Sequence, residues 1–139
     1  MAMVTGRLLV ATRGQGLHEI TGDVMAWLGQ HNAGRGLLTI FIRHTSASLL
    51  IQENAASEVR ADLEDFFRAL APEDVTRYRH DDEGADDMPA HIRSALLPSH
   101  LAIPVEDGRP LLGTWQGIYV FEHRRAPHRR ELVLQLWRE

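Results

Sequence analysis

Apolar residues recur at helical spacing in three stretches of the chain. In the longest stretch, Val59, Leu63 and Phe67 share one face with other large apolar residues, while acidic residues lie off it. Glycine and proline mark the points where these patterns stop, because neither continues a helix well. The predicted helices run from Thr21, which can cap its own helix, to Gly34 or Gly36, from Ser57 to Leu70, and from Pro89 to Leu97.

Short runs rich in β-branched and aromatic residues predict strands between and after these helices. Asp107-Gly108, between two apolar runs, is the strongest hairpin signal. Strands alternate with helices early and follow one another late, which predicts an α+β fold with antiparallel sheet and helices packed to one side. No repeat or linker divides residues 1–139, so we expect a single domain. The expected strands are Arg7–Arg13, Leu37–His44, Leu49–Glu53, Leu101–Val105, Leu111–Gly113, Gly117–His123 and Glu131–Trp137.

The composition excludes several classes of reaction. Among 139 residues there is no cysteine, and all 15 basic residues are arginine, so lysine is absent too. A thiolate nucleophile, a disulfide, a Schiff base and a phosphate-binding lysine are thereby ruled out. Eight histidines, 19 acidic residues, hydroxyl groups and arginines remain for chemistry. The net charge of −4 argues against a nucleic-acid partner, which needs a basic face.

The chain shows no pattern typical of export or of a membrane protein. Its longest near-apolar stretch, Gly36–Ile42, falls far short of the ~20 residues that span a bilayer. The apolar run Leu8–Ala11 is too short for the centre of a signal peptide. We therefore expect a cytoplasmic protein with no membrane partner.

His44 ends a predicted strand whose alternate positions are apolar, so its ring should face an apolar layer. Thr45 and Ser46 begin the turn that follows. A histidine at the tip of a buried strand suits catalysis. The alternative is a core histidine satisfied by a backbone carbonyl, because buried titratable groups are often structural.

An acidic segment from Tyr78 to Asp87 contains five carboxylates, and His91 follows Asp87 by four residues. Carboxylate oxygens such as those of Asp86 and Asp87 suit Mg²⁺ or another hard cation. The spacing does not match an EF-hand, and a solvated acidic loop is the alternative. We therefore expect either a cation site or a solvated loop here.

The histidines and arginines offer two further sites, provided that the fold assembles them. His44, His80 and His91 are far apart in sequence, but together they make a chemically reasonable zinc site. Arginines cluster between Arg124 and Arg130, where their guanidinium forks suit phosphate or carboxylate, or simply form a solvated loop. An acidic loop and an arginine loop brought together would suit a magnesium-diphosphate substrate.

Glu122 is expected on the apolar face of a strand, where a carboxylate must be paired. A structural ion pair with an arginine is the simplest explanation for it. The segment Gly113–Gly117 precedes this strand, and its two glycines permit close approach of the backbone to a neighbour.

Four motifs resemble the YjbQ family of secondary thiamine-phosphate synthases, in the same order along the chain. The resemblance implies an α+β fold with an antiparallel β-sandwich and flanking helices, assembled as a homotrimer with clefts near the subunit contacts. It also implies a weak activity that joins hydroxymethylpyrimidine diphosphate to a thiazole phosphate, releasing pyrophosphate. The motifs are His44-Thr45-Ser46-Ala47-Ser48-Leu49, Glu53-Asn54, Gly84 to Ile92, and Gly113-Thr114-Trp115-Gln116-Gly117-Ile118 followed by Glu122.

The resemblance and the motifs together give a set of expected site residues. The catalytic residues are His44, His80 and His91. The metal, Mg²⁺ or Zn²⁺, is expected at Asp86 and Asp87, or alternatively at the three histidines, and no organic cofactor is expected. The substrate-binding residues are Thr45, Ser46, Asn54, Thr114, Gln116, Glu122, Arg129 and Arg130.

We therefore hypothesise a transferase that acts on a small phosphorylated metabolite. The thiazole nitrogen attacks directly, so no nucleophilic side chain is needed, and the enzyme acts by positioning and by neutralising the leaving group. Two alternatives remain open: a metal-dependent hydrolase of a phosphorylated metabolite, and a non-catalytic oligomer that binds an anionic metabolite.

Overall fold

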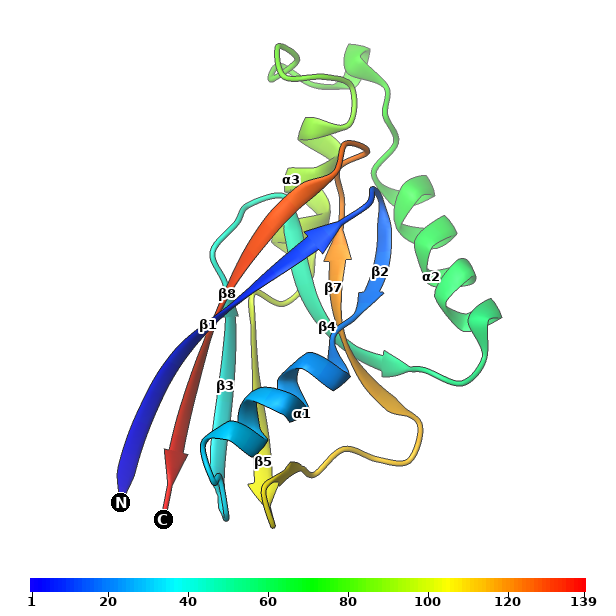
Figure 1. Ribbon diagram of the computed structural model, residues 1–139. Coiled ribbons are helices and arrows are strands. Elements are labelled where there is room, and N and C mark those ends of the chain that lie inside the picture. Colours follow the sequence, from blue (N-terminus) through cyan, green and yellow to red (C-terminus); the bar gives the residue numbers. More distant parts are fainter.

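Two antiparallel sheets form the body of the computed structural model, which describes residues 1–139 (Figure 1). The larger sheet contains, in spatial order, β1 (Ala2–Thr12), β8 (His128–Arg138), β3 (Gly36–Ile42), β5 (His100–Glu106) and β6 (Arg109–Pro110). The smaller contains β2 (Gly16–Glu19), β7 (Gln116–Glu122) and β4 (Ala47–Glu53). With three α-helices beside them, these sheets confirm the α+β fold with antiparallel strands.

The hydrophobic core lies between the two sheets and under helix α1 (Thr21–Gln30). Inward-facing residues of β3, β5 and β8 meet those of β4 and β7 in one cluster of 18 buried residues. Trp27 of α1 reaches this layer across Gly6 of β1, where an added Cβ would clash with the indole ring. Helix α1 therefore covers the inner face of the larger sheet and leaves its other face bare.

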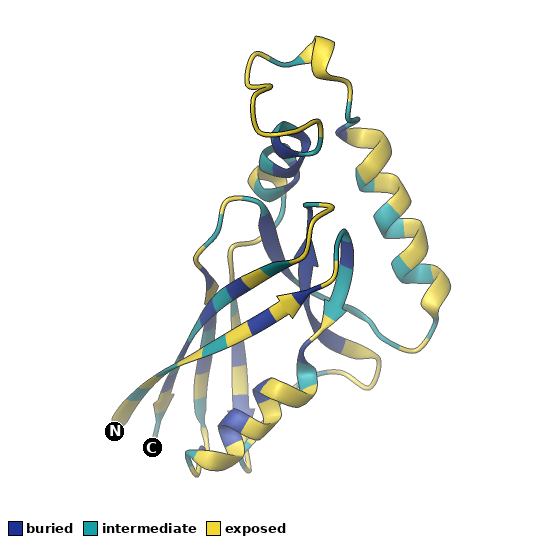
Figure 2. Ribbon diagram, turned by 45° about the horizontal axis from the view of Figure 1, so that its top comes forward, coloured by how far each residue is buried: buried dark blue, intermediate teal, exposed yellow.

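Helix α2 (Ser57–Leu70) begins and ends where the sequence predicts, but it buries none of its residues (Figure 2). Phe67 packs edge-on against Phe121 of β7, with 5.7 Å between ring centroids. Arg93 of helix α3 (Asp87–Leu96) fixes the end of α2, since its guanidinium donates to the carbonyls of Phe67 and Ala71 at 3.1 and 2.8 Å. The Phe67 carbonyl also accepts the Ala71 N–H at 3.2 Å, whereas the Ala71 carbonyl lies past the last helical residue and has no donor within the helix. None of the α-helices has the length and apolar character needed to cross a bilayer.

Several local predictions were wrong. Residues 111–113 form no strand, because β5 pairs instead with Arg109–Pro110 directly after the Asp107-Gly108 turn. Thr21 does not cap α1: its hydroxyl accepts the Ile118 N–H of β7 at 2.9 Å and donates to Glu19. The third helix starts at Asp87, two residues before Pro89. Neither β2 nor the 3₁₀ turn η1 (Val75–Arg77) was predicted, because four and three residues are too short to show a period.

Candidate functional site

Four polar side chains converge where the loop before α3 meets the first turns of that helix. This part of the backbone lies at one end of the molecule (Figure 1). They are His80, Glu83, Asp87 and His91, and one potential ligand atom of each lies within 4.8 Å of the others. Asp87 Oδ2 lies 2.9 Å from His80 Nε2 and 3.2 Å from His91 Nε2. Asp87 and His91 share a face of α3 because they are four residues apart.

The electrostatics of this cluster favour a bound cation. Hydrogen bonds to Glu83 and then to Asp87 raise the pKa of His80 above its ordinary value. Burial alone would raise the pKa of Asp87, but its contacts with Glu83, His91 and His80 outweigh burial and lower it. The proton shared by His80 and the carboxylates is what a divalent cation would displace, so cation binding here competes with protons.

Arg124 supports the cluster from outside. Its Nη1 donates to Asp87 Oδ1 at 2.7 Å, which leaves Oδ2 facing the histidines. Outer partners of this kind orient metal ligands. Asp86 is not a member: its Oδ2 accepts from Arg124 Nε and from the Arg125 backbone N–H, both at 2.9 Å. Of the two predicted metal-binding carboxylates, the cluster therefore contains only Asp87.

A second polar cluster lies on the strands beside the turn between β3 and β4. Glu122 and Arg130 are buried, with 0% and 3% of their surface exposed. Arg130 donates to both Glu122 oxygens, at 2.7 and 2.5 Å, and Thr12 donates to Glu122 Oε1 at 2.6 Å. Of the two possibilities for Glu122, the structure thus shows the ion pair with an arginine, and this carboxylate holds Arg130 in place.

His44 faces Arg130 in an open hollow of about 460 Å³, which Arg43, Thr45 and Ser46 also line. Its Nε2 accepts the Glu131 backbone N–H at 2.8 Å, so the proton of the neutral ring belongs on Nδ1. Burial, and then the charge of Arg130, lower the pKa of His44 and keep the ring neutral. Nδ1 and Arg130 Nη1 lie 3.4 Å apart, so with the proton on Nδ1 both nitrogens are donors at this hollow. This arrangement suits an anionic oxygen.

The two clusters meet at the end of β7. Glu122 Oε2 accepts the backbone N–H groups of His123 and Arg124 at 3.0 and 3.1 Å, as well as Arg130. The Arg124 side chain then continues to Asp87. The consecutive residues Glu122, His123 and Arg124 thus join the anion-facing hollow around His44 to the histidine–carboxylate cluster. His44 lies in the former and His80 and His91 in the latter, so the alternative site made of three histidines does not form.

Other predicted substrate-binding residues lie elsewhere. Three of them, Asn54, Thr114 and Gln116, lie at the start of β7. Glu122 ends this seven-residue strand, so about 20 Å separates it from them. There Asn54 N–H donates to the Trp115 carbonyl at 2.9 Å, and Gln116 accepts from the Gly113 N–H at 2.8 Å. Arg129 is exposed because strand alternation turns it away from its buried neighbour Arg130.

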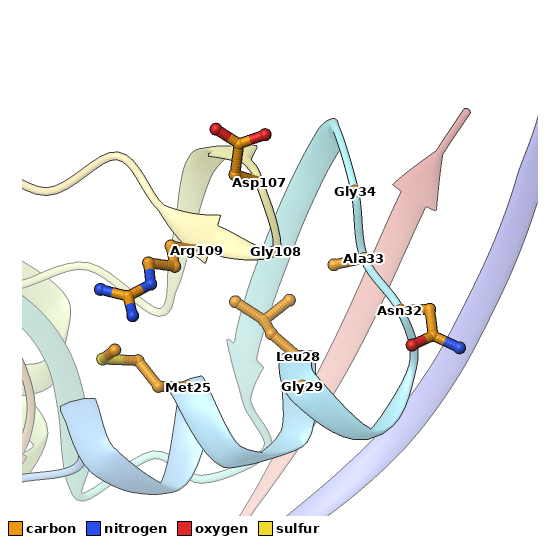
Figure 3. A pocket seen from close by; sticks show the side chains of 9 residues that line it. All are labelled: Met25, Leu28, Gly29, Asn32, Ala33, Gly34, Asp107, Gly108 and Arg109. Atoms are coloured by element: carbon orange, nitrogen blue, oxygen red, sulfur yellow. The ribbon is translucent and has the colours of Figure 1, made fainter.

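The largest hollow, about 570 Å³, lies between the end of α1 and the β5–β6 turn (Figure 3). Leu28 and Ala33 line it beside several glycines, and it contains no histidine. Figure 3 shows the Asp107 carboxylate turned away from the Arg109 guanidinium, so charged groups do not converge there. We therefore place the candidate site at the histidine–carboxylate cluster and the His44 hollow.

Comparison with known proteins identifies the family. A family model described as UPF0047 protein YjbQ-like matches residues 7–139. The chain belongs to the YjbQ family. A UPF0047 protein of Synechocystis sp. is 51% identical over 93% of this chain and 88% of its own length. The UPF0047 protein YjbQ of Escherichia coli O157:H7 is 42% identical over 93% of this chain and 94% of its own.

The crystal structure of a conserved hypothetical protein from Thermus thermophilus has the same fold as this YjbQ-family chain. It superposes with a TM-score of 0.85 at 36% identity, over 95% of this chain and 99% of that one. These matches confirm the resemblance seen in the four sequence motifs. They describe a family whose function is unknown.

Sequence reasoning missed polar residues that the YjbQ fold brings to the site. Glu83 joins the cluster instead of Asp86. Both are carboxylates of the same acidic segment, and only the course of the backbone in the loop decides which one reaches the histidines. Arg124 was one of several similar arginines, and its contact with Asp87 is long-range in sequence. The four-residue spacing of Asp87 and His91 was the one local signal that pointed to the cluster.

Proposed function

We propose that this chain is a metal-dependent transferase of the thiamine-phosphate synthase type. It would join hydroxymethylpyrimidine diphosphate to a thiazole phosphate. The supporting observation is the connection, through Glu122 to Arg124, between a metal-binding set of side chains and a hollow in which hydrogen-bond donors converge. A diphosphate group needs both features, because its oxygens require cationic charge and directed donors.

The donor set fits a divalent transition metal. Two imidazoles and two carboxylates suit zinc and its neighbours, whereas Mg²⁺ prefers oxygen ligands alone. His80, Glu83, Asp87 and His91 would hold the ion, and Arg124 would orient Asp87. Bound there, the cation would neutralise charge on the leaving diphosphate.

The remaining residues would hold and orient the substrates. His44 Nδ1–H and Arg130 donate to phosphate oxygens, and Arg43, which pairs with Glu131 at 2.9 Å, lines the same hollow. The thiazole nitrogen forms a bond to the methylene carbon of the pyrimidine while the bond from that carbon to the diphosphate oxygen breaks. The electron pair of the broken bond leaves with the diphosphate. Because the ring nitrogen of the substrate is the nucleophile, a chain without cysteine or lysine can carry out this step.

A metal-dependent phosphate-ester hydrolase is the second candidate. The two imidazole ligands favour it, since histidine-rich sites commonly activate a water molecule for attack. The two reactions differ in product: the transferase releases pyrophosphate only when both precursors are present, and the hydrolase releases phosphate from a single substrate.

Product analysis with both precursors and Zn²⁺ or Mn²⁺ tests the proposal. We expect thiamine phosphate and pyrophosphate in equal amounts, and a loss of about a hundredfold in rate for His44→Ala, because a donor to the charged oxygens is removed. His31→Gln, at the distant end of α1, is the matched control and should retain the rate. Phosphate release from one precursor alone would point to the hydrolase, and tight ligand binding without turnover would contradict both enzymes.

We further propose that the chain assembles as a cytoplasmic homotrimer through the bare face of the larger sheet. Met3, Trp137 and Leu37 stand opposite one another on neighbouring strands and are 43–49% exposed. Leu9 and Phe41 extend this apolar face. An apolar sheet face of this extent is typical of a protein interface. Because Phe41 also lines the His44 hollow, a neighbouring subunit would border the site.

Light scattering coupled to gel filtration tests the assembly. Phe41→Asp should convert a trimer to monomers, because it places a charge in an apolar contact. Met25→Asp, a similarly exposed position on α1, should leave the trimer intact. A wild-type monomer, or a trimer unaffected by Phe41→Asp, would contradict the proposed interface.

A further inference from the structure

A third polar hollow, about 370 Å³ in volume, lies behind the candidate site, between the end of α2, α3 and the turn after β7. Arg68, Arg93 and Arg125 line it together with Gln15, Pro72 and a single acidic residue, Glu73. None of these residues belongs to the histidine–carboxylate cluster or to the His44 hollow. Arg125 pairs with Glu73, and Arg68 pairs with Asp65 at 2.7 Å, so the charge at this surface that has no carboxylate partner is that of Arg93.

Arg93 is the unusual member of the set. It is 2% exposed, and its two bonded nitrogens donate to neutral backbone carbonyls. Buried arginines normally pair with a carboxylate, because an uncompensated charge is costly away from water. Burial, and then the repulsion of Arg68, lower the pKa of Arg93. The charge of Arg93 therefore lacks a partner within the protein.

A buried histidine gives a second, independent indication. His123 is 0% exposed, its Nε2 contacts the Ser48 hydroxyl at 2.9 Å, and its Nδ1 has no hydrogen-bond partner. It lines an inner hollow of about 10 Å³ that shares Gln15, Arg68 and Arg93 with the outer one. The inner hollow has room for about one water molecule, which could bridge Nδ1 to a ligand in the outer hollow.

We propose that this outer hollow is a second anion site, which binds a phosphate group through Arg68, Arg93 and Arg125. Guanidinium forks match tetrahedral oxyanions with paired hydrogen bonds. The site goes beyond the proposed reaction and does not depend on it.

Glu73 sets the affinity of this site. Its carboxylate pairs with Arg125 and accepts from Gln15 Nε2 at 2.9 Å, so it competes with phosphate for the most exposed of the three arginines. The site is also linked to the metal cluster, because the Arg125 backbone N–H donates to Asp86, the neighbour of Asp87. If bound phosphate moved Arg125 inward, the bond from its backbone N–H to Asp86 would transmit the movement to the loop that supplies the metal ligands.

Titration calorimetry with metal-free protein at constant ionic strength tests this site. The His44→Ala background removes a key donor of the other anion-facing hollow. We expect inorganic phosphate to bind about tenfold more weakly to Arg125→Gln or Arg68→Gln, because a charge-assisted bond is lost. Glu73→Gln should bind it several-fold more tightly, because the competitor is neutralised. Arg35→Gln, an exposed arginine at the opposite end, is the matched control and should be unchanged.

A parallel titration with glycerol 3-phosphate distinguishes free phosphate from the phosphate of a metabolite, according to which binds more tightly. His91→Ala should retain phosphate binding, which separates this site from the metal cluster. Equal affinity in wild type, Arg125→Gln and Arg68→Gln, or weaker binding in Glu73→Gln, would overturn the proposal.

Discussion

Replacing Asp87 by asparagine is expected to weaken Zn²⁺ binding by more than about a hundredfold and to abolish turnover. Asp87 is the only member of the cluster in contact with both histidines, and an amide nitrogen or neutral oxygen cannot replace the charged Oδ2. Losing an outer partner of a metal ligand already costs about 10–100-fold, so losing a ligand should cost more. Calorimetric titration of the metal-free protein measures the change directly.

Two further variants keep this result interpretable. Asp81→Asn removes an exposed carboxylate from the same loop, and it should bind Zn²⁺ as wild type does. His91→Ala leaves the bond from Arg124 to Asp87 intact, so its loss of metal reflects the ligand and not the fold. Undiminished Zn²⁺ affinity in both Asp87→Asn and His91→Ala would show that the cluster is not the metal site.

Glu122→Gln is expected to lower the free energy of unfolding by about 3–5 kcal/mol, the usual cost of breaking a buried ion pair on one side. The substitution leaves Arg130 charged and buried, while the other bonds to Glu122 change little in shape. Adding Arg130→Met should recover part of the loss. Urea unfolding of the wild type, Glu122→Gln and the double variant measures these changes. Glu131→Gln, whose ion pairs are exposed, is the control and should change the stability far less than Glu122→Gln does.

The effect of Glu122 should depend on pH in a defined direction. Burial raises its pKa, but the bonds from Arg130 and Thr12 outweigh burial and lower it below its ordinary value. Its contribution to stability is therefore complete above about pH 4.5 and is lost at lower pH. Burial lowers the pKa of His123 to about 3, so that residue makes the protein less stable as pH falls from about 6.5 towards 3. Glu122→Gln should remove only the loss of stability below about pH 4.5. If the variant and the wild type lost stability equally over this range, the role given to Glu122 would be contradicted.

The elements predicted well from sequence are those long enough to show a regular spacing of apolar residues within the element itself. Helix α2 shows a long apolar stripe, and its predicted bounds match the structure. The extent to which that stripe is covered was not predictable, because coverage depends on which distant residues pack against it. Thr21 shows the same limit: its hydroxyl had a local use as a cap, but a tertiary contact with Ile118 of β7 takes it.

The candidate site followed the same rule. Residue types and motifs singled out His44, His80, His91 and Asp87, because histidine and carboxylate side chains can bind metals and transfer protons. Their division into two clusters could not be predicted, because strands β3, β7 and β8 bring together residues that are about 40 to 90 positions apart in the sequence. Motif order could not show that Asn54 and Gln116 lie at the other end of β7.

The attachment of α2 has a consequence for local unfolding. The helix buries no residue of its own. It is held at its end by the two bonds from Arg93, and along its length by the edge-on contact of Phe67 with Phe121 and by the Leu17 N–H, which donates to Glu64 at 2.9 Å. It can therefore separate from the sheets at much less cost than global unfolding, while the core of 18 residues stays closed. Its backbone amides should therefore exchange with solvent through this partial opening, and the stability of the opening unit is set by these contacts, two of which come from one arginine on another helix.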